Sequence, residues 1–134
     1  MGLIYDKAAE RYSPKVVDHG INPRNHGFME NPDGYASFTG PCGDTMEIFL
    51  RVRNGIIDDI TFDTDGCAFT LAAGSVATEL AKGKSFAECL ALNESAILDE
   101  LENMPDDHTH CARLAALTFH KALRNCFRKM KEDE

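Results

Sequence analysis

The stretch Met46-Glu47-Ile48-Phe49-Leu50-Arg51-Val52-Arg53-Asn54-Gly55, together with residues 56–64, predicts the centre of the fold. Its alternating apolar residues are typical of a strand that buries one face, and they are Met46, Ile48, Leu50 and Val52. Asn54-Gly55 is the strongest short-range signal for a hairpin turn. The return strand follows through Ile56, Asp58, Ile60, Phe62 and Thr64.

The segments on either side complete the predicted sheet and begin its helical cover. Residues 35–39 are expected to form a third strand, which gives a three-stranded antiparallel sheet with one face to cover. Before the sheet, Ser13 and Pro14 predict the start of a short helix that runs from Lys15 to about His19 and stops at Gly20. Residues 5–12 are expected to add one or two helical turns.

The remainder of the chain is predicted to be helical. Helical spacing of apolar residues runs from Phe69 to Leu80, and Gly83 ends it. Ser85 begins a capping box, Asn93 caps a helix that reaches Leu101, and a last helix extends over residues 110–130. Strands followed by helices predict an α+β fold, with helices packed mainly on one face of the sheet and a single domain over residues 1–134.

Composition and charge exclude several classes of protein. The chain has 134 residues, of which 43% are hydrophobic, and a net charge of −8. It can therefore bury a core, but it is a poor binder of nucleic acid. The absence of a long apolar run and of an export signal predicts a cytoplasmic protein that does not enter a membrane. Residues 108–131 carry six bases and no acid, which is typical of a solvated helix face or of a surface for an acidic partner.

Five cysteines, an odd number in a chain without an export signal, argue against a disulfide framework. Cys89 and Cys126 lie on apolar helix faces and are expected to be small core residues. The other three, Cys42, Cys67 and Cys111, lie where one predicted element gives way to the next. At such junctions backbone amides are free, and a helix N-terminus can stabilise a thiolate.

Further metal-ligating side chains lie beside these three cysteines. Asp44 follows Cys42 by two residues, and His110 and His108 lie next to Cys111. No Cys-x-x-Cys pair occurs, so the tertiary fold would have to assemble the site. Three thiolates, a carboxylate and one or two imidazoles suit Zn²⁺, Fe²⁺ or an iron–sulfur cluster. Three packed thiols remain the alternative.

In their order along the chain, several motifs resemble the IscU/NifU N-terminal scaffold family of iron–sulfur cluster assembly proteins. The matching segments are Tyr12-Ser13, Asn22-Pro23-Arg24-Asn25-His26-Gly27, Gly40-Pro41-Cys42-Gly43-Asp44, Gly66-Cys67-Ala68, Thr78-Glu79 and His110-Cys111-Ala112-Arg113-Leu114-Ala115. The resemblance extends from about Tyr5 to Lys131. It implies the same three-stranded sheet covered by helices.

The resemblance also implies a function. Members of this family accept sulfur from a cysteine desulfurase of the IscS/NifS type, combine it with iron into a transient [2Fe-2S] cluster and release the cluster to apo-proteins. By this match Cys42, Cys67 and Cys111 are the cluster cysteines, Asp44 is the site aspartate, His110 is the site histidine, and Cys111 accepts the persulfide. Whether Asp44 or His110 completes the cluster as the fourth ligand stays open. Ferredoxin or frataxin-like partners are implied as well, and almost the same ligand set would also accept zinc in the purified protein.

The chain departs from the family pattern in a few places. Family members often carry Leu-Pro-Pro-Val-Lys before His-Cys, a segment that an Hsp70-type chaperone recognises. Here residues 103–109 differ, so chaperone-assisted release by that route is not expected, and His108 replaces the lysine. The SufU branch, with its insertion before the third cysteine, is a poorer match. The further cysteine-containing domains of full-length NifU do not follow in this sequence, so the chain is a stand-alone scaffold or a fragment.

Two other functions remain open at this point. A zinc-stabilised binding module would use the same ligands permanently. A thiol enzyme would use Cys111 with a histidine base, although neighbours on a helix point about 100° apart, which argues against His110 as that base. The three remaining histidines are not expected to bind metal: His19 and His26 flank the Asn-Pro loop, and His120 shares a helix side with arginines.

Overall fold

The computed structural model describes residues 13–132, so the helical turns expected over residues 5–12 lie outside the described range. Its helices and strands follow the predicted order. They are α2 (Pro14–Ile21), β1 (Gly34–Thr39), β2 (Thr45–Arg53), β3 (Ile56–Thr64), α3 (Ala68–Ala81), α4 (Phe86–Leu90), α5 (Glu94–Leu101), the 3₁₀ helix η1 (Asp106–His108) and α6 (Thr109–Glu132).

The three strands form an antiparallel sheet in the order β1-β2-β3. Arg53 pairs with Ile56 across Asn54 and Gly55, which have φ values of 55° and 75°. Both values lie in the left-handed region that a two-residue hairpin requires, so the predicted Asn-Gly turn is confirmed.

A bulge in β3 changes which residues of the return strand face the core. Arg51 pairs with Asp59 and Val52 pairs with Ile57, so Asp58 is an extra residue without a partner on β2. As a result Ile57 is 1% exposed and Ile56 is 44% exposed. The placement of Ile56 in one alternating series with Ile60 is therefore wrong, because the sequence pattern does not reveal the extra residue.

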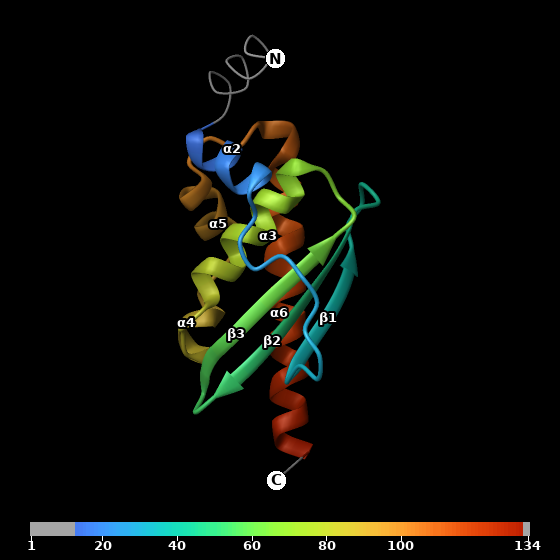
Figure 1. Ribbon diagram of the computed structural model, residues 1–134, viewed down its shortest axis with the longest axis vertical. Coiled ribbons are helices and arrows are strands. Elements are labelled where there is room, and N and C mark those ends of the chain that lie inside the picture. The colour runs from blue at the N-terminus through green and yellow to red at the C-terminus, as the bar shows by residue number, and fades with distance from the viewer. Residues whose placement is uncertain (1–12, 133–134) are drawn as a thin grey trace.

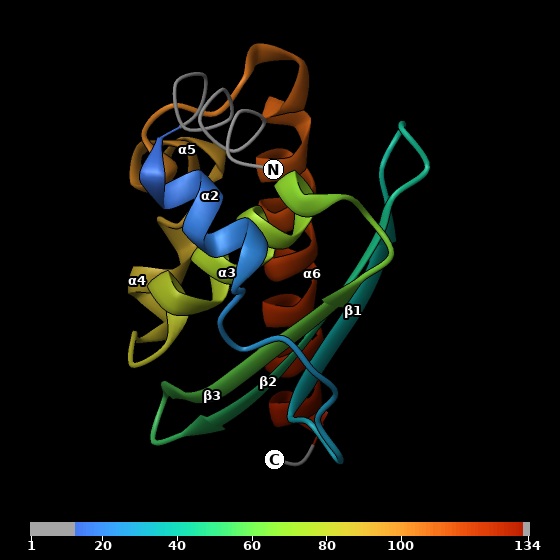
Figure 2. The same ribbon diagram turned by 45° about the horizontal axis from the view of Figure 1, so that its top comes forward.

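The helices cover one face of the sheet, which confirms the predicted α+β architecture. Helix α6 packs across β1 and β2 and α3 packs against β3, while α2 and α5 pack on α3 (Figures 1 and 2). On the opposite face the segment 22–33 crosses the strands (Figure 1), pairs with Phe62 through Asn25 and Gly27, and places Phe28 edge-on against Phe49. Within residues 13–132, no helix combines the length and the apolar character needed to cross a bilayer.

Local capping interactions fix where three of the helices begin. The Val16 amide donates to Ser13 Oγ, the Ala96 amide donates to the Asn93 side chain, and Ser85 and Glu88 form a reciprocal capping box. All three caps were predicted from sequence. Helix α2 begins at Pro14 and runs past Gly20 to Ile21, and is therefore longer than predicted.

The close approach of α3 to β3 depends on the absence of a side chain at Gly74. A Cβ atom built at Gly74 would lie 2.4 Å from two ring carbons of Phe62, which is fully buried. Because β3 ends where α3 begins, this contact also sets the position of the first turn of α3 at the end of the sheet. Cys67 caps that turn and Thr70 lies within it.

We expect Gly74→Ala to destabilise the protein by about 1–3 kcal/mol, because the methyl group would force Phe62 or α3 to move. Urea unfolding followed by circular dichroism measures the change. The matched controls are Phe62→Leu alone and the double variant with Gly74→Ala and Phe62→Leu. Because leucine is smaller than phenylalanine and leaves room for the methyl group, the double variant should lose less stability than the sum of the two single losses. An unchanged midpoint for Gly74→Ala would contradict this account of the contact.

Candidate metal and cluster site

Three connections far apart in the sequence meet at one end of the sheet (Figures 1 and 2). The β1–β2 connection carries Cys42 and Asp44, Cys67 is the N-cap of α3, and Cys111 is the third residue of α6. Cys42 and Cys67 are exposed, whereas Cys111 is buried. The fold thus places all three sequence-predicted cysteines at the same end, with one thiol inside and two outside.

The tightest group of ligand atoms in the described part of the chain belongs to Cys67, His108 and Cys111. One donor atom from each lies within 4.8 Å of the other two. The remaining candidates, Cys42, Asp44 and His110, lie around this group without belonging to it. The structure therefore brings together two of the three predicted cysteines and the histidine that departs from the family pattern.

Thr70 connects the ligands and was missed by sequence reasoning. Its buried hydroxyl donates to Asp44 Oδ2 at 3.0 Å. The hydroxyl oxygen, Thr70 Oγ1, also lies 3.4 Å from Cys111 Sγ and 3.8 Å from Cys67 Sγ. A spacing of three residues places Thr70 on the same side of α3 as Cys67, and this is the signal that could have identified it. Thr70 thus holds the carboxylate toward the two thiols.

Two glycines give the ligands the space that they occupy. Gly43 has a φ of +94°, which lets the chain turn between Cys42 and Asp44. A Cβ atom at Gly66 would lie 2.6 Å from Thr70 Oγ1 and 2.8 Å from Asp44 Oδ2. Any side chain at Gly66 would therefore displace the contact between Thr70 and Asp44.

Burial dominates the acid–base behaviour of Cys111. Desolvation raises the pKa of its thiol to about 11, and the negative charges of Cys67, Asp44 and Cys42 act in the same direction, while the Thr70 hydrogen bond lowers it. Burial therefore opposes the stabilisation of a Cys111 thiolate that the helix N-terminus was expected to provide. A bound metal ion would reverse this, because a coordinated thiol is deprotonated.

His110 reaches the Cys111 sulfur despite its position one residue earlier on the same helix. The distance from His110 Nε2 to Cys111 Sγ is 3.8 Å, a long contact within the range of hydrogen bonds to sulfur. The 100° separation of neighbouring residues is overcome by the length of the imidazole side chain. His110 also lines a small cavity of about 50 Å³ together with Cys42, Arg113 and Leu117.

The motifs found in the sequence agree with a comparison against protein families. Residues 11–133 match the family described as the NifU-like N terminal domain. The chain belongs to this family. The match covers every described ligand of the site, and the NifU-like family is the one expected from the sequence motifs.

Related proteins of the NifU-like family carry names that refer to cluster assembly. The chain is 44% identical over 119 residues to iron-sulfur cluster assembly scaffold protein IscU 1 of Archaeoglobus fulgidus, which is 88% of this chain and 78% of that protein. It is 43% identical over 109 residues to the scaffold protein IscU of Escherichia coli K12, which is 78% of this chain and 84% of that one.

Solved structures of the NifU-like family have the same fold. A nitrogen-fixing NifU-like protein (N-terminal) from Brucella abortus superposes with a TM-score of 0.70 at 24% identity, covering 94% of this chain and 98% of that one. A putative SUF-system scaffold from Fervidobacterium islandicum AW-1 gives a TM-score of 0.71 at 21% identity, with coverages of 87% and 98%. At these identities the likeness concerns the fold alone.

The other cysteines and histidines have structural environments away from the site. Cys89 and Cys126 are fully buried in the core, as predicted. His19 contacts the Ser75 hydroxyl at 2.6 Å, and His26 pairs with Asp63 at 3.0 Å. His120 was expected to be solvated, but it is partly buried and its Nε2 bonds to the Leu92 carbonyl, because α6 packs beside the end of α4.

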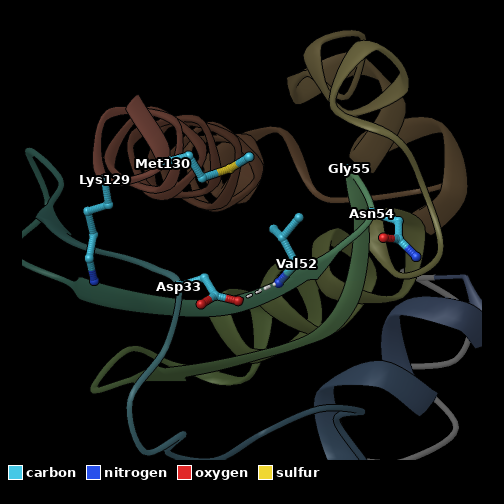
Figure 3. Close-up of a pocket in the computed structure, with 6 residues that line it drawn as sticks. All are labelled: Asp33, Val52, Asn54, Gly55, Lys129 and Met130. Atoms are coloured by element: carbon cyan, nitrogen blue, oxygen red, sulfur yellow. Dashed lines mark hydrogen bonds between the residues drawn. The ribbon is translucent and has the colours of Figure 1, made fainter. Parts of the chain in front are cut away.

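A larger cavity lies at the opposite end of the sheet and lacks cysteine and histidine. It measures about 320 Å³ and is lined by Asp33, Val52, Asn54, Gly55, Lys129 and Met130 (Figure 3). Asp33 Oδ2 accepts a hydrogen bond from the Val52 amide at 2.8 Å, so this carboxylate is already bound to the backbone of β2. The larger cavity therefore does not contain the candidate metal ligands, which lie at the other end of the sheet with Cys42 and Cys67 exposed to solvent.

We expect Cys111 to be the slowest of the three site cysteines to react with iodoacetamide in chelator-treated protein at pH 8. A pKa of about 11 instead of the ordinary value of 9.0 leaves about 100-fold less thiolate, and burial adds a steric barrier. Mass spectrometry of timed samples measures the rate at each cysteine. In urea-unfolded protein the three rates should become similar, and preferential labelling of folded Cys111 would contradict the burial described here.

Proposed function

We propose that this protein is an iron–sulfur cluster assembly scaffold that accepts sulfur from a cysteine desulfurase, binds iron, assembles a transient [2Fe-2S] cluster and hands it to apo-proteins. The observation that carries the proposal is the group formed by Cys67, His108 and Cys111, with donor atoms within 4.8 Å of one another at a solvent-open end of the fold. The names of relatives at 37–44% identity support it.

The mixed character of the donor set suits a cluster that is cargo and must leave again. Thiolates bind iron–sulfur clusters firmly, whereas a carboxylate or an imidazole is a more exchangeable ligand for them. Cys42, Cys67 and Cys111 supply the thiolates, and Asp44 and a histidine supply the other donors. Because Thr70 holds Asp44 beside Cys111, the carboxylate is at hand as a ligand that a cluster can lose easily.

Sulfur acceptance is assigned to Cys111, following the family motif. The Cys111 thiolate attacks the outer sulfur of the desulfurase persulfide, the sulfur–sulfur bond breaks, and the desulfurase leaves as a thiolate. Its proton must first be removed, and His110 Nε2 lies 3.8 Å from the sulfur as a candidate acceptor. Each transferred sulfur then needs two electrons to become sulfide, which a thiol or a ferredoxin supplies.

The burial of Cys111 places a condition on this transfer. The sulfur of a partner reaches Cys111 only when neighbouring residues move aside, and Thr70 of α3, which also holds Asp44, is one of these neighbours. Gly43, with its positive φ, and Gly66 flank the ligands at the two places where such movement would occur. We therefore propose that binding of the desulfurase opens the site before sulfur is transferred.

The protein is proposed to act with partners and not as a turnover enzyme. Its partners are a cysteine desulfurase, apo-proteins that receive the cluster, and ferredoxin or frataxin-like proteins. A cytoplasmic location suits its five free cysteines, because thiols stay reduced there. Release by an Hsp70-type chaperone through residues 103–109 is not proposed, since Met104 in that segment is buried and is not offered as a free peptide.

Anaerobic reconstitution tests the proposed function. We expect Fe²⁺, a thiol, cysteine and a catalytic amount of desulfurase to produce the visible absorption of a [2Fe-2S] cluster on the protein. Cys111→Ser should abolish sulfur acceptance and cluster formation, because the nucleophile is lost. The matched control is Cys126→Ala, which removes a buried thiol elsewhere in α6 and should leave assembly intact. Failure of the wild-type protein to develop the cluster spectrum would overturn the proposal.

We expect Asp44→Ala to lengthen the lifetime of the assembled cluster several-fold and to slow its transfer to an apo-ferredoxin. The substitution removes the hard, exchangeable ligand and a negative charge that repels the thiolate-ligated cluster. The decay of the visible absorbance in the presence of a chelator measures the lifetime. Asp58→Ala, at the exposed bulge in β3, removes the same charge at a distance and should have no effect. A shorter lifetime in Asp44→Ala would identify Asp44 as an essential structural ligand.

A zinc-stabilised binding module is the second candidate, and the three donor atoms already within 4.8 Å of one another favour it. In that case zinc would raise the unfolding midpoint and a chelator would lower it, because metal binding and folding are coupled. The two candidates differ in reconstitution: a permanent zinc site would keep its metal and would show no cluster spectrum.

A further inference from the structure

His108 has an environment that a solvent-exposed histidine does not need. It ends η1, and its ring stacks on Phe69 of α3 with the ring centroids 3.9 Å apart and the planes 22° apart. Its Nδ1 atom is buried and has no hydrogen-bond partner among the described residues, while Nε2 lies 3.9 Å from Asp107 Oδ2. The ring is therefore held in place with one nitrogen turned away from water.

A buried nitrogen without a partner is unfavourable by about 1–3 kcal/mol, so such an atom calls for an explanation. The metal-ligating atoms that lie within 4.8 Å of a nitrogen of the His108 ring are the sulfurs of Cys67 and Cys111. A metal ion bound by the two sulfurs and by the imidazole would give this buried ring a polar partner and would deprotonate both thiols.

The spacing of the three donors fits this explanation. In a tetrahedral zinc site with bonds of about 2.0–2.3 Å, neighbouring ligand atoms lie about 3.3–3.8 Å apart. The donor atoms of Cys67, His108 and Cys111 lie within 4.8 Å of one another, so a closure of at most about 1.0–1.5 Å brings them to this spacing. Cys67 is exposed and can make that movement.

We propose that Cys67, His108 and Cys111 form a three-ligand site for a single divalent metal ion of borderline softness, Zn²⁺ or Fe²⁺, without the participation of Cys42. Two thiolates and one imidazole are the donor types that such ions favour. Three protein ligands leave a fourth position open to water or to incoming sulfur. The proposal that these three residues bind a metal ion is independent of the proposed function. The use of this site to bind the first iron ion for cluster assembly rests on that function.

His110 is the rival ligand, and the structure distinguishes the two histidines. The family motif assigns the site histidine to His110, whose Nε2 lies 3.8 Å from Cys111 Sγ but which is outside the three-donor group. The ring centroids of His108 and His110 are 6.1 Å apart, so removing one imidazole leaves the other in its own place.

Binding of Co²⁺ to chelator-treated, anaerobic protein tests the site, because thiolate-to-cobalt charge transfer reports the sulfur ligands and the visible bands report tetrahedral geometry. Competition with Zn²⁺ gives relative affinities. We expect His108→Gln to weaken Co²⁺ binding by at least about tenfold. We expect Cys42→Ser to leave both the affinity and the charge-transfer intensity unchanged. His26→Gln, which removes an imidazole paired with Asp63, is the matched control and should behave as wild type.

A second variant separates ligation from a structural role of His108. His108→Cys keeps a donor at the position, so it should retain metal binding and show additional thiolate-to-cobalt intensity, which a residue that only packs on Phe69 would not produce. Circular dichroism of the metal-free variants checks that each is folded. Wild-type affinity in His108→Gln together with lost affinity in His110→Gln would overturn the proposal, as would lost charge-transfer intensity in Cys42→Ser.

Cluster reconstitution on the same variants keeps the two proposals apart. If the wild-type protein binds Co²⁺ through His108 but forms no cluster, the scaffold function fails and the three-ligand site stands. If a cluster forms equally well on wild type and on His108→Gln, and Co²⁺ affinity is also equal, the three-ligand site fails and the scaffold function stands.

Discussion

The contact between the Phe62 ring and the bare α-carbon of Gly74 is the constraint on which the arrangement of this protein depends. It lets α3 lie directly on β3 at a distance that no other residue at that position would permit. The first turn of α3 then falls over the end of the sheet, where the β1–β2 connection and the start of α6 also lie. Three connections separated by tens of residues thereby become one site, although none of them contains a complete set of ligands.

Within that site the Thr70 hydroxyl has more neighbours than it has hydrogens to give. Asp44, Cys111 and Cys67 all lie within its reach, but a hydroxyl donates one hydrogen at a time. When Cys111 is a neutral thiol, the hydrogen goes to the Asp44 carboxylate, and a thiolate at Cys111 would compete for it. The protonation state of Cys111 therefore determines whether Thr70 holds the Asp44 carboxylate or releases it.

Much of the fold could be predicted because its signals are local. The Asn54-Gly55 turn and the caps at Ser13, Ser85 and Asn93 depend on residues within a few positions of one another. The bulge at Asp58 could not be predicted in this way, because an extra residue becomes visible only when two strands are paired. Because Asp58 is unpaired, the side chain of Ile57 lies in the core and that of Ile56 is exposed.

The sequence indicated the residue types of the candidate site but not their geometry. Position at element junctions indicated Cys42, Cys67 and Cys111, and neighbouring donors indicated Asp44 and the histidines. The position of His108 beside the two sulfurs depends on its stacking on Phe69, a contact between η1 and α3 that no spacing in the sequence reveals. The burial of Cys111, which opposes the expected effect of the helix N-terminus, likewise follows from long-range packing.

The unequal exposure of the three site cysteines gives any cluster bound among them an inner and an outer edge. Cys111 would hold the inner edge inside the protein, and Cys42 and Cys67 would hold the outer edge at the surface. Under the proposed function, thiols of a receiving protein would approach from outside and would replace the two outer bonds before the inner one. The depth of each sulfur would thus set the order of release, and the bond to Cys111 would be the last to break.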